Sequence, residues 1–281
     1  MRTIHSAKPR LELTEFVRSY AQREVIANDA DSSQSNVAGL ESCIAFEFGD
    51  PMIMDYLNGQ TKLCPRIACF GASTAPPLTF RFRGHTINFA IFLRPLALKQ
   101  LFRIDPSVVV NRDFEGISVF GRGVEELWLK LAERSTFLER VRVAEEYLLP
   151  FALYALVRTP IMLSAQHIIR QMGTTRIDEV ANHTALSLRQ FERRFADEIG
   201  LRPKLFARIT RFQMALDVKR VASHRAWLSV AHQLGYFDQM HMIRDFQSLG
   251  GGSPVQIINQ FGDLHPWSLA STSKVPFDIS R

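Results

Sequence analysis

Apolar and polar residues alternate with a period of two over much of the first half of the chain. Alternation is clear at residues 44–48 and 78–82, and it resumes at residues 87–93 after Gly84 and His85. A period of two places every second side chain on the same face of an extended strand. A glycine-containing break between two such runs is typical of a hairpin turn. We therefore expect a β-rich first domain, similar to a barrel or a sandwich, with a hairpin turn at Gly84.

The period changes to that of a helix from about Val124 onwards. Apolar residues then step by four and three positions, at Phe137, Val141, Ala144, Leu148, Phe151 and Ala155. This stripe is either a dimer seam or a face that packs on the chain's own β domain, and we favour the second. Pro150 lacks an amide donor, which argues against one straight helix through it.

Residues 157–164, around Pro160, are the candidate linker between two domains. Beyond them an otherwise helical stretch is interrupted by Pro203, Gly235 and Gly250–Gly252. The expected fold is α+β with two domains. Residues 1–158 form the β-rich domain with flanking helices at its C-terminal end. Residues 164–262 form an all-α domain, and residues 263–281 form a loosely ordered tail.

The helical domain contains one short pattern twice, at residues 179–195 and 229–246. With Ser187 aligned on Asp238 the offset is 51, and further pairs follow in order. These are Phe191 with Met242, Arg193 with Arg244, Phe195 with Phe246, Gly200 with Gly251 and Pro203 with Pro254. Upstream the offset is 50, so the second turn is one residue longer. A duplicated helix-turn-helix explains so many ordered pairs.

The side chains within each copy suit a helix that enters a DNA groove. Ser187 and Asp238 are good N-cap residues, because a side-chain oxygen can accept from the free amides of the first turn. Phe191 and Phe195 lie one turn apart, which leaves Arg193 on the opposite face. Arginine can donate two hydrogen bonds to guanine in the major groove. The intervening helix of about 20 residues spans about 30 Å, close to the spacing of about 34 Å between successive groove segments.

Net charge supports the same interpretation. The chain carries +6, of which residues 164–262 supply +5 through 13 lysines and arginines against 8 acidic residues. A basic excess of this kind neutralises DNA phosphates, although a solvated basic surface is the alternative. The candidate phosphate contacts are Arg194, Arg202, Lys204, Arg208 and Lys219.

Residues from about 164 to 260 resemble the DNA-binding domain of AraC/XylS-type transcription regulators. The matching positions are Ala181, Ser187, Arg193, Phe195, Gly200, Pro203, Arg211, Ala215, Ala231, Gly235, Tyr236, Arg244, Phe246, Gly251 and Pro254. Residues 87–121 resemble an uncharacterised N-terminal domain of some regulators of this family. Ala185 departs from the family pattern, which often has glycine in the first turn, and Met242 replaces a larger core residue.

The resemblance implies a cytoplasmic regulator, an activator by its family, that reads double-stranded DNA. Its implied partners are RNA polymerase, a small-molecule effector in the N-terminal domain and a second copy of the chain. The implied base contacts are Arg189, Gln190, Glu192, Arg193, Gln239, Met240, Ile243 and Arg244. Because Met240 and Ile243 are apolar, we expect the first copy to read most of the sequence.

Other classes of protein find less support in the sequence. Cys43, Cys64 and Cys69 are too sparse for a zinc site and are expected to be reduced, buried thiols. A cupin-like metal enzyme needs clustered histidines, whereas the β region has only His85 apart from His5 near the terminus. We expect no catalytic residue, metal or cofactor. No apolar run is long enough to span a membrane, and no signal peptide is recognised. The remaining alternatives are the cupin-like enzyme and an architectural DNA-binding protein without an effector.

Overall fold

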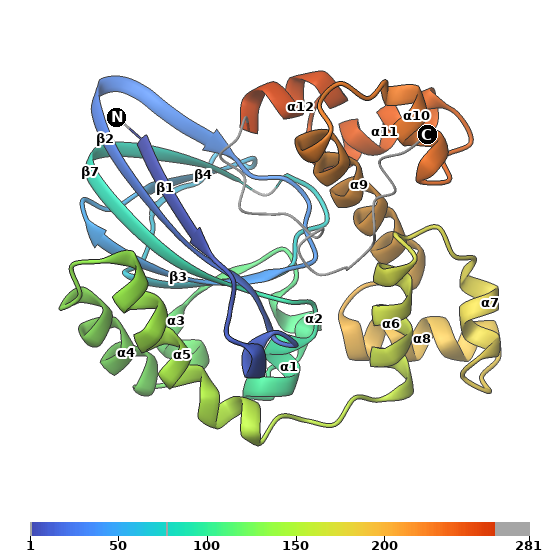
Figure 1. The fold of residues 1–281 in the computed structure, drawn as a ribbon, viewed down its shortest axis with the longest axis horizontal. Helices are drawn as coiled ribbons and strands as arrows, with labels where there is room; N and C mark the ends of the chain where they lie inside the picture. Colours follow the sequence, from blue (N-terminus) through green and yellow to red (C-terminus); the bar gives the residue numbers. More distant parts are fainter. Residues whose placement is uncertain (1, 77, 262–281) are drawn as a thin grey trace.

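The structure is a computed structural model that describes residues 2–76 and 78–261. The described chain forms a β-rich lobe followed by a helical lobe, and the two lie side by side (Figure 1). The two-domain α+β architecture expected from the sequence is therefore confirmed. The expected tail, residues 263–281, lies outside the described residues.

The N-terminal lobe contains one curved, antiparallel sheet of eight strands. The strands are β1 (Arg2–Ala7), β2 (Val17–Ser35), β3 (Ser42–Gly49), β4 (Ile53–Tyr56), β5 (Thr61–Leu63), β6 (Ile67–Phe70), β7 (Leu78–Leu93) and β8 (Asp113–Glu115). Their order is β1-β2-β7-β3-β6-β8, and β4 pairs with both β5 and β7. The long strands β2 and β7 pair along most of their length and so form the spine of the sheet.

The predicted hairpin at Gly84 is wrong, because β7 runs through it as a single strand. Leu78 and Phe82 pack in the cluster on one face of the sheet, whereas Phe89 and Ile91 pack in the cluster on the other. The alternation thus shifts phase because β7 passes from a region buried on one face to a region buried on the other. Gly84, with φ of 61°, bends the strand without reversing it.

Helices cover one face of this sheet. They are α3 (Gly116–Phe120), α4 (Gly123–Ala132) and α5 (Phe137–Leu153), with η1 (Leu11–Leu13), α1 (Ala97–Phe102) and α2 (Pro106–Val109) nearby. The predicted apolar stripe of α5 packs with Phe46, Phe89 and Ile91 of the sheet, so packing on its own domain is confirmed. The prediction that a helix would not run through Pro150 is wrong, because α5 continues to Leu153. Pro150 lies in the last turn, where a missing amide donor interrupts little of the helix.

The C-terminal lobe contains two helix-turn-helix units in succession. Its helices are α6 (Pro160–Arg170), α7 (Ile177–Asn182), α8 (Leu188–Ile199), α9 (Pro203–Val221), α10 (Trp227–Gln233), α11 (Gln239–Gly250) and α12 (Pro254–Phe261). The predicted linker 157–164 overlaps the first turn of α6, in which Pro160 occupies a favourable first-turn position. Gly200 and Gly251 end the second helix of each unit in the left-handed conformation, with φ of 80° and 76°.

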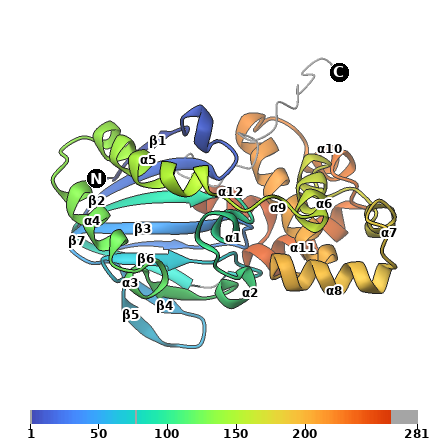
Figure 2. The same ribbon diagram turned by 90° about the horizontal axis from the view of Figure 1, so that it is seen from below.

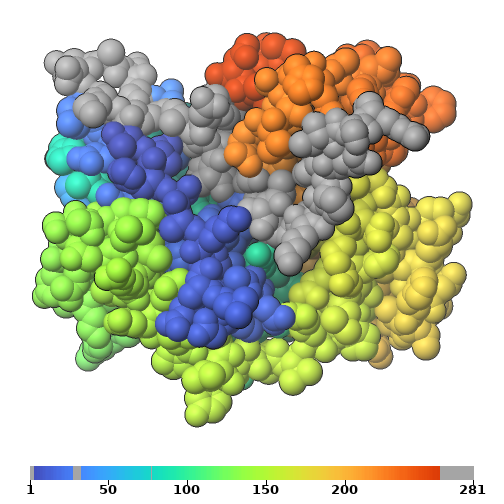
Figure 3. Space-filling view, in the orientation of Figure 1, coloured from blue at the N-terminus to red at the C-terminus, as the bar shows by residue number. Residues whose placement is uncertain are grey.

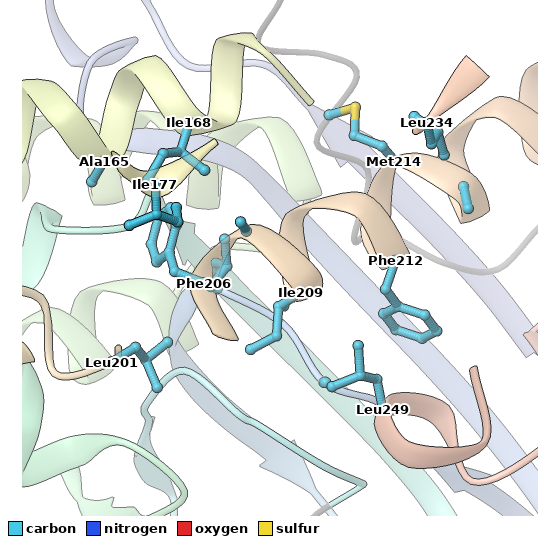
Figure 4. Packing of buried hydrophobic residues seen from close by; sticks show 14 of the residues in the cluster. Ala165, Ile168, Ile177, Leu201, Phe206, Ile209, Phe212, Met214, Leu234 and Leu249 are labelled. Carbon is cyan, nitrogen blue, oxygen red and sulfur yellow. The ribbon is translucent and has the colours of Figure 1, made fainter. Parts of the chain in front are cut away.

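One hydrophobic cluster spans both lobes. The cluster around α9 includes Phe206, Ile209 and Phe212, and α6, α7 and α11 contribute to it (Figure 4). Val37, Ala38, Leu40 and Leu96 of the N-terminal lobe belong to the same cluster. The C-terminal lobe is therefore packed against its neighbour and not merely tethered to it.

Candidate nucleic-acid interface

The N-terminus of each second helix is capped as the sequence predicts. The Ser187 hydroxyl accepts from the Gln190 amide at 3.3 Å, and Gln190 Oε1 accepts from the Ser187 amide at 3.0 Å. Asp238 Oδ1 accepts from the His241 amide at 2.6 Å. Both helices consequently start at a fixed residue, which fixes the side chains that each presents to solvent.

Helix α8 has a fully buried aromatic face and an exposed basic face. Phe191 and Phe195 have no exposed surface, and their rings lie 5.5 Å apart. Arg189 and Arg193 are exposed on the other side. They line a groove of about 600 Å³ together with Glu192, Ala196, Asp197, Arg202 and Lys204. The structure thus brings three predicted base contacts together with two predicted phosphate contacts.

Helix α11 repeats this arrangement with a more apolar outer face. Met242 and Phe246 are fully buried, while Arg244 is exposed. Met240 is 55% exposed, and Phe237, in the turn just before Asp238, is 90% exposed. Phe237 is not among the residues that the sequence predicts to contact DNA.

Most of the predicted contact residues are exposed. Arg189, Gln190, Arg193, Arg194, Arg202, Lys204, Gln239, Met240 and Arg244 are exposed, whereas Glu192, Ile243, Arg208 and Lys219 are half-buried. Within the described residues, three of these side chains have polar partners. Gln190 completes the cap of α8. Arg208 donates to Asp245 Oδ1 at 3.0 and 2.7 Å, and Lys219 donates to the carbonyls of Ser223 and Arg225. Arg208 thereby ties α9 to α11. The Asp245 side chain is only 3% exposed, so its side of this ion pair is shielded from water.

The two units sit at the two ends of α9. Its 19 residues span about 28 Å, and α8 and α11 lie at opposite ends of it (Figure 1). Helix α9 buries residues around most of its circumference, including Phe206, Ile209, Phe212 and Val218. A helix packed in this way holds the two units at a fixed separation.

The N-terminal lobe contacts α8 and α9 directly. The C-terminal end of α8 abuts α2 (Figure 2), and a Cβ built on Gly200 would lie 2.8 Å from the Pro106 carbonyl carbon. On α9, Gln213 accepts from the Leu40 amide at 3.2 Å and donates to Glu41 at 2.7 Å. The orientation of the helical lobe is therefore coupled to that of the sheet.

A cavity of about 320 Å³ lies at the boundary of the lobes. Its walls include Arg18, Glu41 and Arg94 from the N-terminal lobe, and Ile169 and Arg170 from α6. In Figure 3 the blue N-terminal segment borders the yellow-green connection that leads into α6 on the same side of the molecule. No feature of the hydrophobic pattern indicated this cavity.

Thiol and histidine chemistry is limited in the described residues. Cys43, Cys64 and Cys69 are buried and unpaired, as expected, and burial raises the pKa of Cys69 to about 12. His85 lies 2.6 Å from Glu24. Among residues 2–76 and 78–261, no three histidine, cysteine or acidic side chains are placed to hold a metal ion. None of the helices described there could cross a membrane.

Comparisons with known proteins agree on the fold. The chain shares 8% identity with apo ToxT K231A from Vibrio cholerae strain SCE256, covering 90% of this chain and 99% of that one with a TM-score of 0.52. The chain has the ToxT fold. ToxT is an AraC-family transcription regulator, so the resemblance inferred from the sequence is confirmed at the level of fold.

Two other ToxT structures align over the same extent but less closely. ToxT from Vibrio cholerae O395 shares 9% identity over 93% of this chain and 98% of its own, with a TM-score of 0.47. Unsaturated fatty acid bound wild-type ToxT from strain SCE256 shares 8% identity over 93% and 94%, also with a TM-score of 0.47. No family model matches the sequence, and no curated protein matches it significantly. The ToxT fold is thus recognised through shape and not through sequence identity.

Proposed function

We propose that the protein is a sequence-specific DNA-binding transcription regulator whose N-terminal lobe senses a small molecule. The observation that carries this proposal is the exposed face of α8, where Arg189, Glu192 and Arg193 share one groove with Arg202 and Lys204. A groove that combines side chains able to read bases with cations able to hold phosphates suits a DNA duplex. The second unit, at the other end of α9, adds Arg244 and the apolar side chains of Met240 and Ile243.

The protein contacts phosphates, in this proposal, mainly through Arg194, Arg202 and Lys204. These side chains are exposed, whereas Arg208 and Lys219 are engaged within the lobe. Arg208 and Lys219 would therefore contribute less to binding than the sequence suggested. RNA polymerase and a second copy of the chain remain the proposed protein partners.

A genome-wide binding map followed by footprinting would identify the operator and test the proposal. Affinity for that operator should then fall steeply between about 50 and 200 mM salt. Arg202→Ala and Lys204→Ala should each reduce the slope of log K against log salt by about 0.9. Arg134→Ala, on the distant α4–α5 turn, is the matched control and should leave the slope unchanged. An affinity that does not depend on salt would refute the proposed interface.

The sensing part of the proposal rests on the cavity between the lobes. A ligand there would contact both lobes, and so it could change how the helical lobe is held. ToxT has been crystallised with an unsaturated fatty acid, but the argument for a ligand in this chain comes from its own cavity.

A further inference from the structure

The cavity at the lobe boundary contains more positive charge than its own residues neutralise. Four arginines line it, Arg18, Arg94, Arg158 and Arg170, against the two glutamates Glu15 and Glu41. Arg158 is paired with Glu15. This leaves Arg18, Arg94 and Arg170, which are opposed by Glu41 in the lining and by the buried Asp217, whose charge also acts on Arg18.

Arg18 is the least satisfied of these groups. Its side chain is 1% exposed, a carboxylate oxygen of Glu41 lies 3.8 Å away, and its guanidinium lies over the Phe92 ring. None of its three guanidinium nitrogens makes a hydrogen bond within the described part of the chain. Glu41 is shared, because it also accepts from Gln213 at 2.7 Å. A buried guanidinium without hydrogen bonds is costly, which points to a missing anionic partner.

Arg94 adds a second cation beside Arg18. Its Nε donates to the Thr14 carbonyl at 2.6 Å. Burial lowers the pKa of Arg94, and the positive charge of Arg18 lowers it further. Repulsion between these two positive charges at the edge of one cavity would be relieved by an anion bound between them.

The rest of the lining limits what the anion can be. Of the ten lining residues, only Pro95 and Ile169 have wholly apolar side chains. The other eight carry charged or polar groups, and four of them are arginines, so the lining favours a ligand with negative charge at more than one point. Arg94 belongs to the sheet lobe and Arg170 to α6, so a ligand with an anionic group at each end can contact both lobes.

We propose that the cavity binds a compact dianion, such as a dicarboxylate or a phosphate ester, between Arg18 and Arg94 on one side and Arg170 on the other. The inference rests on the proposed sensing function and specifies its ligand class. It also separates this chain from the fatty-acid complex known for ToxT.

Calorimetric titration of the full-length protein tests the ligand class, with glutarate and glycerol 3-phosphate as dianions and butyrate and oleate as monoanions. At least one dianion should bind about tenfold more tightly than butyrate or oleate. Arg170→Gln and Arg94→Gln should each weaken that dianion about tenfold, and the surface control Arg134→Gln should not. Arg170 is exposed, so its replacement leaves the fold intact even if Arg94→Gln destabilises the sheet.

Three results would overturn the proposal: oleate binding more tightly than both dianions, arginine variants that bind the dianion as well as the wild type, or no dianion binding at about 10 mM. Operator affinity without ligand is measured on the same preparations. Failure of the ligand class and failure of the DNA-binding function are thereby distinguished.

Discussion

Arg193 and Phe195 lie two positions apart on α8, yet one is exposed and the other is fully buried. This contrast follows from helical geometry, which turns successive side chains by about 100°. The burial of Phe195 against Phe206, with ring centroids 5.5 Å apart, fixes the direction in which Arg193 points. A base contact made by Arg193 would therefore be preorganised by its aromatic neighbours.

Replacing Arg193 by alanine should weaken operator binding and relax specificity at one base pair. The expected loss of discrimination is about 1–3 kcal/mol, because a bidentate contact to guanine is lost. Melting of the variant should match the wild type, since the side chain is exposed. Competition assays with single-base operator variants measure the effect. Equal selectivity of variant and wild type would remove Arg193 from the proposed interface.

Glu47 lies at the other extreme of exposure. It is buried in the sheet, where Asn88 and the Cys64 thiol donate to its Oε1 and Oε2 has no hydrogen bond within the described chain. Burial raises the pKa of Glu47 to about 8. The folded protein thus keeps this carboxyl protonated at neutral pH, whereas the unfolded chain ionises it.

Glu47→Gln should therefore stabilise the protein at pH 8 and not at pH 4. Below the unfolded pKa of 4.5 the carboxyl is protonated in both states and costs nothing. As pH rises from there to about 8, the unfolded state is increasingly favoured, and the wild type loses stability that the glutamine variant keeps. The expected gain at pH 8 is about 4 kcal/mol in the free energy of unfolding, because the pKa rises from 4.5 to about 8 on folding. Urea titrations at both pH values measure it, and an equal effect at pH 4 would contradict the assigned protonation.

The turn between the two helices of each helix-turn-helix unit contains one residue in the left-handed region. In the second unit this residue is Gly235, with φ of 67°, and in the first it is Ala185, with φ of 54°. A side chain in this region costs about 1–2 kcal/mol. The departure from the family pattern noted in the sequence thus corresponds to strain in the structure.

Ala185→Gly should raise the free energy of unfolding by about 0.5–1 kcal/mol, because the gain in backbone fit exceeds the added entropy of the unfolded chain. The reciprocal change Gly235→Ala should lower it by a similar amount. A Cβ at Gly235 would meet Thr174 only at 3.5 Å, so strain and not collision is the cause. Chemical denaturation of both variants is the measurement. A destabilised Ala185→Gly variant would show that the turn is not strained.

The helical elements were largely predictable from sequence, whereas the strands were predictable only in part. Caps such as Ser187 and Asp238 are local signals, because partner and donor lie within three residues. The path of β7 depends on which face is covered by other elements, and no local pattern contains that information. The cavity was not predictable, because Arg18 and Arg170 come together only through the packing of the two lobes.

At the scale of the molecule, polar and apolar contacts join the two lobes along their boundary. Gln213, in the middle of α9, bonds to both Leu40 and Glu41 of the sheet lobe. The Ala38 amide also donates to the Leu249 carbonyl of α11 at 2.8 Å. Contacts of this kind join the N-terminal lobe to both α9 and α11 of the helical lobe.

Gln213→Ala should loosen this connection, because it leaves the Leu40 amide without a buried acceptor. The expected cost is about 1–3 kcal/mol. Scanning calorimetry should show a lower melting temperature and a transition that broadens or splits as the lobes unfold less cooperatively. Gln247→Ala, at an exposed position on α11, is the matched control. A single unshifted transition for Gln213→Ala would mean that the lobes are held by their apolar contacts alone.

The packing of α9 also limits how the protein can be divided. Phe212 on α9 lies 4.9 Å from Phe246 on α11, and Trp227 of α10 contacts the same ring. A fragment cut after α9 would expose Phe212 and its neighbours to water, and it should therefore be prone to aggregation. A shorter protein with only one helix-turn-helix unit would first need polar residues on that side of α9.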